Sequence, residues 1–285
     1  MNRSHIVRRV AVLCVCVVMT LSAATAEEVC VQLDYDLFGH LTNSGNNCAP
    51  TATVNSFRYL EQRYPGVYDN NLTGGDLAGS RDTLAEGMNP TGEGTLPRDW
   101  WEEKIAYIEQ RVPNKTVYKG MLDEEVDPGF DPAVWDRGDR IDYAAPTFDW
   151  LFDELVHGED VEIGIYWGED AGHALTLTSL CFDDSEGGGE YDNSRWDPGV
   201  EDARIDYLDP NAPGGLIWAD LALNGDGRLE FTWDNGGNPA QTVWIGLAYS
   251  ESPVPLPGSM TLILIGLALS PALKSKHTAT RRSGR

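Results

Sequence analysis

Residues 161–181 read VEIGIYWGEDAGHALTLTSLC, two segments on either side of a glycine-containing turn. Residues 161–167 and 174–181 each alternate apolar and polar side chains, which is the pattern of strands with one buried face. Further strand signals follow at 204–208, 216–222, 229–233 and 242–249, separated by Gly, Asp, Asn and Pro. The second half of the chain therefore predicts an antiparallel sheet.

The half of the chain before this segment carries helix signals instead. Asn47 is a favoured N-cap residue, Pro50 suits a first helical turn, and apolar residues then recur at three-residue steps. Residues 97–112 and 145–156 also predict helices, whereas residues 64–97 are rich in Gly, Asn, Asp and Thr and predict a long irregular segment. Helices followed by strands, without a regular alternation, indicate the α+β class.

The first 26 residues have the three parts of a secretory signal peptide. Three arginines within the first nine residues precede an apolar run over 10–24, and Ala24-Thr25-Ala26 supplies small residues for cleavage. The apolar run is short for a stable membrane-spanning helix. We therefore expect export and removal of residues 1–26, with an uncleaved N-terminal anchor as the alternative.

Residues 254–285 have the pattern of a second sorting signal. Val254-Pro-Leu-Pro257 precedes an apolar stretch over 260–273, and five basic residues follow it. This layout resembles the PEP-CTERM sorting signal, although Leu256 replaces the usual glutamate. The resemblance implies an exosortase-like processing enzyme as a partner and membrane attachment through this C-terminal segment. Both ends together predict a protein of the cell envelope or the extracellular space, transiently or stably anchored.

The segment between the two ends is strongly acidic. The ends hold eight of the 21 basic residues and none of the 45 acidic ones, so residues 27–253 carry a net charge of −32. This excludes a nucleic-acid-binding protein, because little positive charge remains to neutralise phosphates. The charge suits salty surroundings, calcium or basic partners, and a solvated acidic surface without a partner is the simpler alternative.

A cysteine, a histidine and an aspartate stand at element ends where they can act together. Cys48 lies at a predicted helix start, where backbone N–H groups and the helix dipole favour the reactive thiolate. His173 opens a strand, and Asp209 ends the next one before Pro210. A carboxylate that fixes one imidazole nitrogen leaves the other nitrogen to take the thiol proton. The alternatives are a buried structural cysteine, a surface histidine and a turn aspartate.

Three short boxes carrying these residues resemble the C39-like branch of papain-fold cysteine peptidases: Asn47-Cys-Ala-Pro-Thr51, Gly172-His-Ala-Leu-Thr-Leu177 and Tyr207-Leu-Asp-Pro210. The resemblance implies a papain-like α+β domain over residues 27–253. Its N-terminal helical part would hold the nucleophile at a helix start, and its C-terminal antiparallel sheet would carry the histidine and the aspartate. Cys48 would be the nucleophile, His173 the general base and then acid, and Asp209 the residue that orients the imidazole. The substrate would be a peptide or protein, and no cofactor is expected.

The sequence departs from the family pattern near the nucleophile. Ala49 replaces the usual glycine, and Thr42 stands where the family has its oxyanion-hole glutamine. Asn43 is the nearest candidate donor, and Gln32 is another if the loop contains an insertion. The second interpretation is therefore a papain-like domain without catalysis that serves as an extracellular matrix or exopolysaccharide-associated binding protein. Transglutaminase-like or amidase chemistry with the same groups is the third.

Three cysteines remain after removal of the signal peptide, so one thiol is unpaired within the chain. Cys181 lies eight residues after His173, about 26 Å along an extended strand, which is too far for it to be the nucleophile. We expect a Cys30–Cys181 disulfide and a free Cys48.

No metal site is expected from the sequence. Outside the two end segments only three histidines remain, scattered along the chain, and they do not form a zinc motif. Residues 224–230 weakly resemble a calcium loop, but a hairpin turn explains them better.

Overall fold

The computed structural model describes residues 27–89, 94–130, 140–168, 171–184, 202–212, 215–234 and 239–254. The predicted signal peptide (1–26) and residues 255–285 of the predicted sorting segment lie outside these ranges. Within the part of the chain that the structure describes, no helix is both long enough and apolar enough to cross a membrane.

The described residues form fourteen elements. In chain order these are β1 (Glu27–Gln32), the short 3-10 helix η1 (Tyr35–Leu37), α1 (Cys48–Arg63), α2 (Leu77–Met88), α3 (Pro97–Arg111), β2 (Thr116–Leu122), β3 (Arg140–Asp142), α4 (Phe148–Val156), β4 (Asp160–Tyr166), β5 (Gly172–Asp184), β6 (Ala203–Leu208), β7 (Leu216–Leu223), β8 (Leu229–Trp233) and β9 (Gln241–Pro253).

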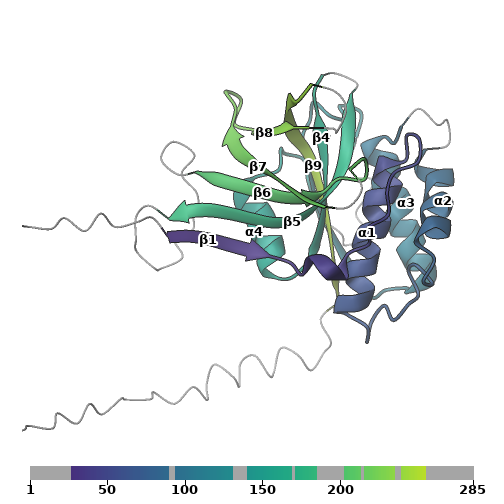
Figure 1. Ribbon diagram of the computed structural model, residues 1–285. Coiled ribbons are helices and arrows are strands. Elements are labelled where there is room, and N and C mark those ends of the chain that lie inside the picture. Colours follow the sequence, from purple (N-terminus) through teal and green to yellow (C-terminus); the bar gives the residue numbers. More distant parts are fainter. Residues whose placement is uncertain are drawn as a thin grey trace, which may run out of the picture.

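Six of the strands close into an antiparallel barrel (Figure 1). Strands β5 to β9 pair in sequence order, and β4 pairs with β5 on one side and with β9 on the other. Three strands extend the sheet beyond the barrel: β1 pairs with β5, β2 pairs with β9, and β3 pairs with β2 in parallel. The pairing shifts at Gly164/Ile165 and at Leu177/Ser179, and such irregularities increase the twist and help a sheet to curve.

The papain-like α+β fold expected from the sequence is wrong. The structure is mostly sheet: a closed six-stranded barrel, three additional strands and four α-helices in the described residues. The physical reason is that alternation along a strand reports which face is buried but not which strands are its neighbours. Two hydrogen-bonded edges on β4 close the sheet on itself, so the strands do not form an open sheet beside a helical part.

Most individual elements agree with the sequence patterns, and a few do not. The predicted helix at Cys48 runs to Arg63, and the strand predicted at 229–233 has those bounds. The segment 64–97 was expected to be irregular, but it contains α2, whose N-cap Asp76 accepts a hydrogen bond from the backbone N–H of Gly79. Strands β2 and β3 were also missed.

Helix α1 lies between the barrel and the other N-terminal helices (Figure 1). It packs against β4 and β5 on one side and against α2 and α3 on the other. Residues 49–57 are all buried, which explains why this helix lacks a broad polar face. The hydroxyl of Thr176 on β5 donates to the backbone oxygen of Ala52, 3.2 Å away, and ties the first turns of α1 to the barrel.

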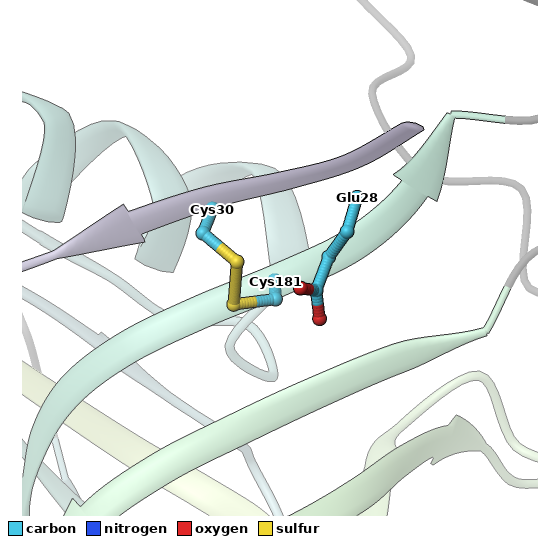
Figure 2. Close-up of side chains that lie close together, drawn as sticks. All are labelled: Glu28, Cys30 and Cys181. Carbon is cyan, nitrogen blue, oxygen red and sulfur yellow. A yellow bond between two sulfur atoms is a disulfide. The ribbon is translucent and has the colours of Figure 1, made fainter. Parts of the chain in front are cut away.

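A disulfide attaches β1 to the barrel. Cys30 and Cys181 are direct partners in the register of β1 and β5, and their sulfurs are bonded, the pairing expected from the sequence (Figure 2). Glu28 lies beside the bond, and Cys48 is the free cysteine. Since 151 residues separate the two cysteines, the bond removes a large amount of conformational entropy from the unfolded chain.

Replacing both bonded cysteines by serine should lower the free energy of unfolding by about 2–4 kcal/mol, because the unfolded chain regains that entropy. Urea denaturation followed by circular dichroism measures the change. Cys48→Ser is the control and should shift stability by less than about 1 kcal/mol. Equal stability of the double variant and the native protein would contradict the structural role of the disulfide.

Candidate active site

The residues of the predicted triad meet at one end of the barrel. Strand β4 ends at Tyr166, β5 begins at Gly172, β6 ends at Leu208 and β8 ends at Trp233. Because neighbouring antiparallel strands run in opposite directions, these four positions share one end of the closed sheet. The same end receives the start of α1, which packs on β4 and β5.

Asp209 holds the ring of His173. Its Oδ1 lies 2.7 Å from His173 Nε2 and also accepts the backbone N–H of Asn211 at 2.7 Å. Its Oδ2 accepts the indole N–H of Trp233 at 2.8 Å. The imidazole is 7% exposed and the carboxylate residue 5%, so their bond is almost entirely shielded from water. A buried carboxylate with this set of donors is fully satisfied and remains ionised.

Cys48 lies on the other side of the imidazole. Its sulfur is near enough to His173 for the imidazole to lower the pKa of the thiol, and since Nε2 is taken by Asp209, Nδ1 is the nitrogen left for the thiol. The backbone N–H groups of Ala49 and Ala174 also donate to the sulfur. Cys48 as a residue is partly exposed. The structure thus brings the three predicted residues into one chain of contacts.

The site favours a thiolate beside an imidazolium. Burial alone raises the pKa of Cys48, but the hydrogen bond and charge of His173 and the N–H groups of Ala174 and Ala49 outweigh it and lower that pKa. Burial likewise opposes a charged His173, yet its bonds to Asp209 and Cys48 raise its pKa to about 9. The pKa of Asp209 is lowered because His173 and its other donors overcome the effect of burial.

Aromatic rings cover the histidine. The ring of Trp233 lies 5.0 Å from that of His173 at an angle of 31°, and Trp167 stacks on Trp233 at 5.1 Å. Tyr166 packs against Trp244 nearby, and burial together with the charge of Cys48 raises the pKa of its phenol. Sequence reasoning missed these residues because a tryptophan that ends an alternating strand looks like an ordinary core residue.

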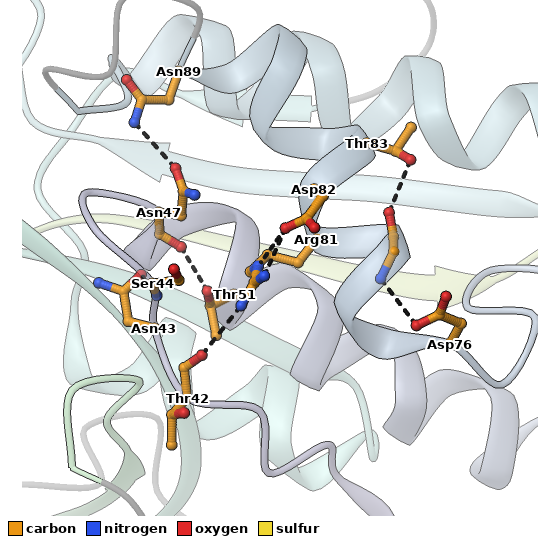
Figure 3. A network of polar contacts seen from close by, with 11 residues as sticks. Thr42, Asn43, Ser44, Asn47, Thr51, Asp76, Arg81, Asp82, Thr83 and Asn89 are labelled. Atoms are coloured by element: carbon orange, nitrogen blue, oxygen red, sulfur yellow. Dashed lines mark hydrogen bonds and ion pairs between the residues drawn. The ribbon is translucent and has the colours of Figure 1, made fainter.

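Asn89, the residue that follows α2, holds the loop that leads to Cys48 (Figure 3). The amide of Asn89 donates to the backbone oxygen of Asn46 at 2.9 Å and to Oδ1 of Asn47 at 3.2 Å. The backbone oxygen of Asn47 in turn accepts both the N–H and the hydroxyl of Thr51. The side chain of the N-cap residue Asn47 therefore bonds to Asn89, at the end of the neighbouring helix α2, and makes no capping bond to α1 itself. This bond fixes the position of the start of α1.

Asn43, the candidate oxyanion donor, is used elsewhere. Its amide nitrogen donates to the backbone oxygen of Gly45 at 2.8 Å and to Oδ1 of Asn211 at 3.1 Å, so both of its N–H bonds are occupied. Its backbone N–H donates to Pro210 at 2.7 Å. Asn43 thus ties the loop before Cys48 to the turn after β6, and it does not serve as a free oxyanion donor in this arrangement.

The other upstream amide is too distant. Gln32 lies opposite Ser179 on β5, six residues and about 20 Å along the strand from His173. The backbone N–H groups at the start of α1, which have no partner within the helix, are the remaining candidate donors for an oxyanion. The N–H of Cys48 is the one next to the sulfur.

The remaining sequence motifs lie away from this end of the barrel or take structural roles. The ring of His157 bonds to the backbone oxygen of Asp153 at the end of α4. Residues 224–228 form the turn between β7 and β8, in which Asn224 Oδ1 accepts the N–H groups of Asp226 and Arg228. The hairpin interpretation of residues 224–230 agrees with this geometry.

A scan against protein-family models and a search of curated proteins gave no match to this chain.

The thiol of Cys48 should react with iodoacetamide as an activated thiolate, with a pH profile whose midpoint lies below the ordinary value of about 8.5. His173→Ala should move the midpoint upward, because burial then acts without a compensating charge, and slow labelling at pH 6 by about tenfold or more. His157→Ala is the control and should label like the native protein. Identical profiles for the native protein and His173→Ala would contradict the ion pair.

Trp233→Phe keeps an aromatic ring but removes the N–H that Asp209 accepts. Because a bond to a buried charged group is lost, the free energy of unfolding at pH 7 should fall by about 2 kcal/mol. The loss should shrink when Asp209→Asn is already present, as a double-mutant cycle in urea will measure. Trp218→Phe, at a position 64% exposed on β7, is the matched control. Equal effects of the two tryptophan variants would argue against the bond.

Proposed function

We propose that this protein is an exported cysteine hydrolase that cleaves peptides or proteins with Cys48, His173 and Asp209. The observation that carries the proposal is the continuous contact from the Cys48 sulfur through the His173 ring to a buried Asp209 carboxylate. The proposal rests on this local arrangement and on the short sequence boxes similar to those of C39-like peptidases, and it does not require a papain-like fold.

The reaction begins with attack on a carbonyl carbon. The Cys48 thiolate forms a bond to this carbon, and the carbonyl electron pair moves to oxygen, where the N–H of Cys48 can donate to it. Collapse of this intermediate breaks the carbon–nitrogen bond, and His173 gives its proton to the leaving amine. The products of this step are a thioester on Cys48, a free amine and a neutral imidazole.

Water completes the cycle. Neutral His173 takes a proton from water as the oxygen attacks the thioester carbon, and the Cys48 thiolate leaves. The imidazolium is restored, and a carboxylic acid is released. Asp209 stays ionised throughout and keeps the ring oriented, with Nδ1 toward the sulfur. The active ionisation state requires a deprotonated Cys48 and a protonated His173, so the rate should fall as pH rises through about 9.

Export agrees with several features of the chain. The two predicted sorting segments at residues 1–26 and 254–285 favour passage across a membrane and attachment at the C-terminal end. A disulfide between Cys30 and Cys181 is typical of an oxidising compartment. The acidic charge of residues 27–253 would attract basic substrate segments.

A free Cys48 favours catalysis over the alternative of an inactive binding protein. Its sulfur is not in a disulfide, and it is partly exposed. An inactive protein would have no need of an imidazolium supported by a buried carboxylate. Acyl transfer to an amine, as in transglutaminase-like chemistry, uses the same thioester, so the acceptor must be found by experiment.

A set of fluorogenic peptides with lysine or arginine near the cleaved bond tests the activity, and mass spectrometry identifies the products. Cys48→Ala should abolish cleavage, and Asp209→Asn should lower kcat/KM by about 10²–10⁴-fold because the imidazole loses its orientation. His157→Ala should be unaffected. Cleavage that survives in Cys48→Ala would reject the proposal. A product in which the acyl group is joined to an added primary amine would instead identify the activity as acyl transfer.

A further inference from the structure

A second group of ionisable side chains lies entirely inside the protein, where α3 packs on the sheet. Lys104 of α3, Glu162 of β4 and Glu251 of β9 are all completely buried. The ammonium of Lys104 lies 2.5 Å from Glu162 Oε2 and 2.5 Å from Glu251 Oε1, so these three residues form an ion-paired triad. No step of the proposed hydrolysis uses them.

Asp160 is a fourth charged group that points into this triad. Its side chain is 0% exposed, and neither of its carboxylate oxygens has a hydrogen-bond partner. One oxygen each of Asp160, Glu162 and Glu251 lie within 4.8 Å of one another. Buried carboxylates in proteins are normally hydrogen-bonded or paired, so two bare oxygens on a fully enclosed aspartate call for a ligand.

The charges of the group do not balance. Three carboxylates and one ammonium leave a net charge of −2 in a fully enclosed space, which is very unfavourable without compensation. The neighbouring hydroxyls are used elsewhere: Tyr68 bonds to Thr116 and Tyr118 donates to Glu109. The ring of Tyr249 lies under the ammonium at 5.3 Å and adds no charge.

The nearest strand also offers no spare cation. Lys119 of β2 is held by Glu154 at 2.9 Å and by Glu159 at 3.5 Å, in a separate group that includes the hydroxyl of Ser250. The excess of two negative charges at Asp160, Glu162 and Glu251 is therefore not met by the ionisable side chains that surround them.

We propose that Asp160, Glu162 and Glu251 bind one calcium ion. The oxygens that have neither a hydrogen-bond partner nor an ion pair supply the ligands: both of Asp160, Oε1 of Glu162 and Oε2 of Glu251. A doubly charged ion brings the sum of charges at the group, with Lys104, to zero. The all-oxygen donor set selects a hard cation, since no histidine or thiol is present among the three residues.

Calcium suits the site better than magnesium. Magnesium gives up its water molecules reluctantly and usually keeps several of them when bound, whereas calcium accepts irregular sets of carboxylate oxygens. A site with three completely buried carboxylates leaves little place for retained water. Glu251 also lies 89 residues after Glu162 in the sequence, which is why no calcium motif marks the three residues.

The ion would act on stability and not on the hydrolysis. Asp160 is the first residue of β4 and Tyr166 the last, so the two ends of this strand are about 20 Å apart. The end of β4 at Tyr166 lies next to Cys48. Asp160 and the other carboxylates of the acidic group lie toward the opposite end. A bound ion joins β4 and β9 through their carboxylates, and Lys104 of α3 stays paired with Glu162 and Glu251 beside it.

The test is a calcium titration of the full protein after treatment with a chelator. At pH 8, millimolar CaCl₂ should raise Tm by about 5 °C or more through preferential binding to the folded state, and MgCl₂ should raise it less. Calorimetric titration with CaCl₂ should give one ion per chain. Asp160→Asn should remove both responses, and Asp220→Asn, which changes an exposed carboxylate on β7, should leave them intact.

Protons bound to Asp160, Glu162 or Glu251 are the alternative to calcium for neutralising the negative charge of these carboxylates. Burial and the charges of Glu162 raise the pKa of Glu251 to about 8, and burial with Glu251 and Glu162 raises that of Asp160. In chelator, these folded-state pKa values exceed the unfolded ones, so stability should fall as pH rises from the ordinary carboxyl range to about 8. Added CaCl₂ should remove that fall if the ion binds.

Three results would overturn the proposal. One is an unchanged Tm in calcium at pH 8, which would leave protons as the neutralising species. Another is a calcium response that persists in Asp160→Asn, and the third is native mass spectrometry showing no bound calcium in the untreated full protein at saturating CaCl₂. The mass measurement needs no variant, so it decides the question even if Asp160→Asn fails to fold. Labelling of Cys48 is independent of all three and tests the hydrolase separately.

Discussion

The pairing of β4 with β5 on one edge and with β9 on the other is the constraint that organises this protein. It turns a row of antiparallel strands into a closed barrel, and closure leaves the barrel strands without free edges. One face of β4 packs against α1, and Glu162 of the same strand pairs with Lys104 of α3. The two ends of β4 then serve different purposes, with the cysteine site at one end and the buried carboxylates at the other.

At the first end, the proposed catalysis depends on mutual electrostatic support and not on any single unusual group. A buried carboxylate with backbone and indole donors stabilises an imidazolium, and the imidazolium stabilises a thiolate at a helix start. Each partner would be costly to bury alone. The arrangement is held from outside by Asn89, which fixes the loop before Cys48, and by Asn43, which joins that loop to the turn after Asp209.

Local chemistry could be predicted from the sequence, and global arrangement could not. Asn47 and Pro50 mark the start of α1, and alternation marks β4 to β9, because these signals lie within a few residues of one another. The proximity of Cys48, His173 and Asp209 was predicted from their positions at element ends together with the resemblance of three short sequence boxes to C39-like peptidases. Barrel closure depends on pairing between strands about eighty residues apart, and nothing in the alternation of β4 identifies β9 as its neighbour. The fold class was wrong for that reason.

Two features of the sites had no local signal at all. Trp233 donates a hydrogen bond to Asp209 from the end of β8. In the sequence, nothing distinguishes this residue from a tryptophan of the hydrophobic core. The three buried carboxylates meet only because two strands distant in the sequence pair with each other; they are Asp160, Glu162 and Glu251. Acidic residues are so common in this chain that the sequence does not single out these three. The signal in both cases is a contact, which appears only in three dimensions.

The disulfide between Cys30 and Cys181 has a consequence for how the chain matures. If the chain crosses a membrane from its N-terminus, Cys30 and Cys48 arrive in the oxidising compartment before Cys181, and the first bond available joins the wrong pair. That early bond would occupy the sulfur of the nucleophile. Release of Cys48 must then wait for β5 to emerge and for exchange to the correct partner, so activity would be withheld until the barrel has formed.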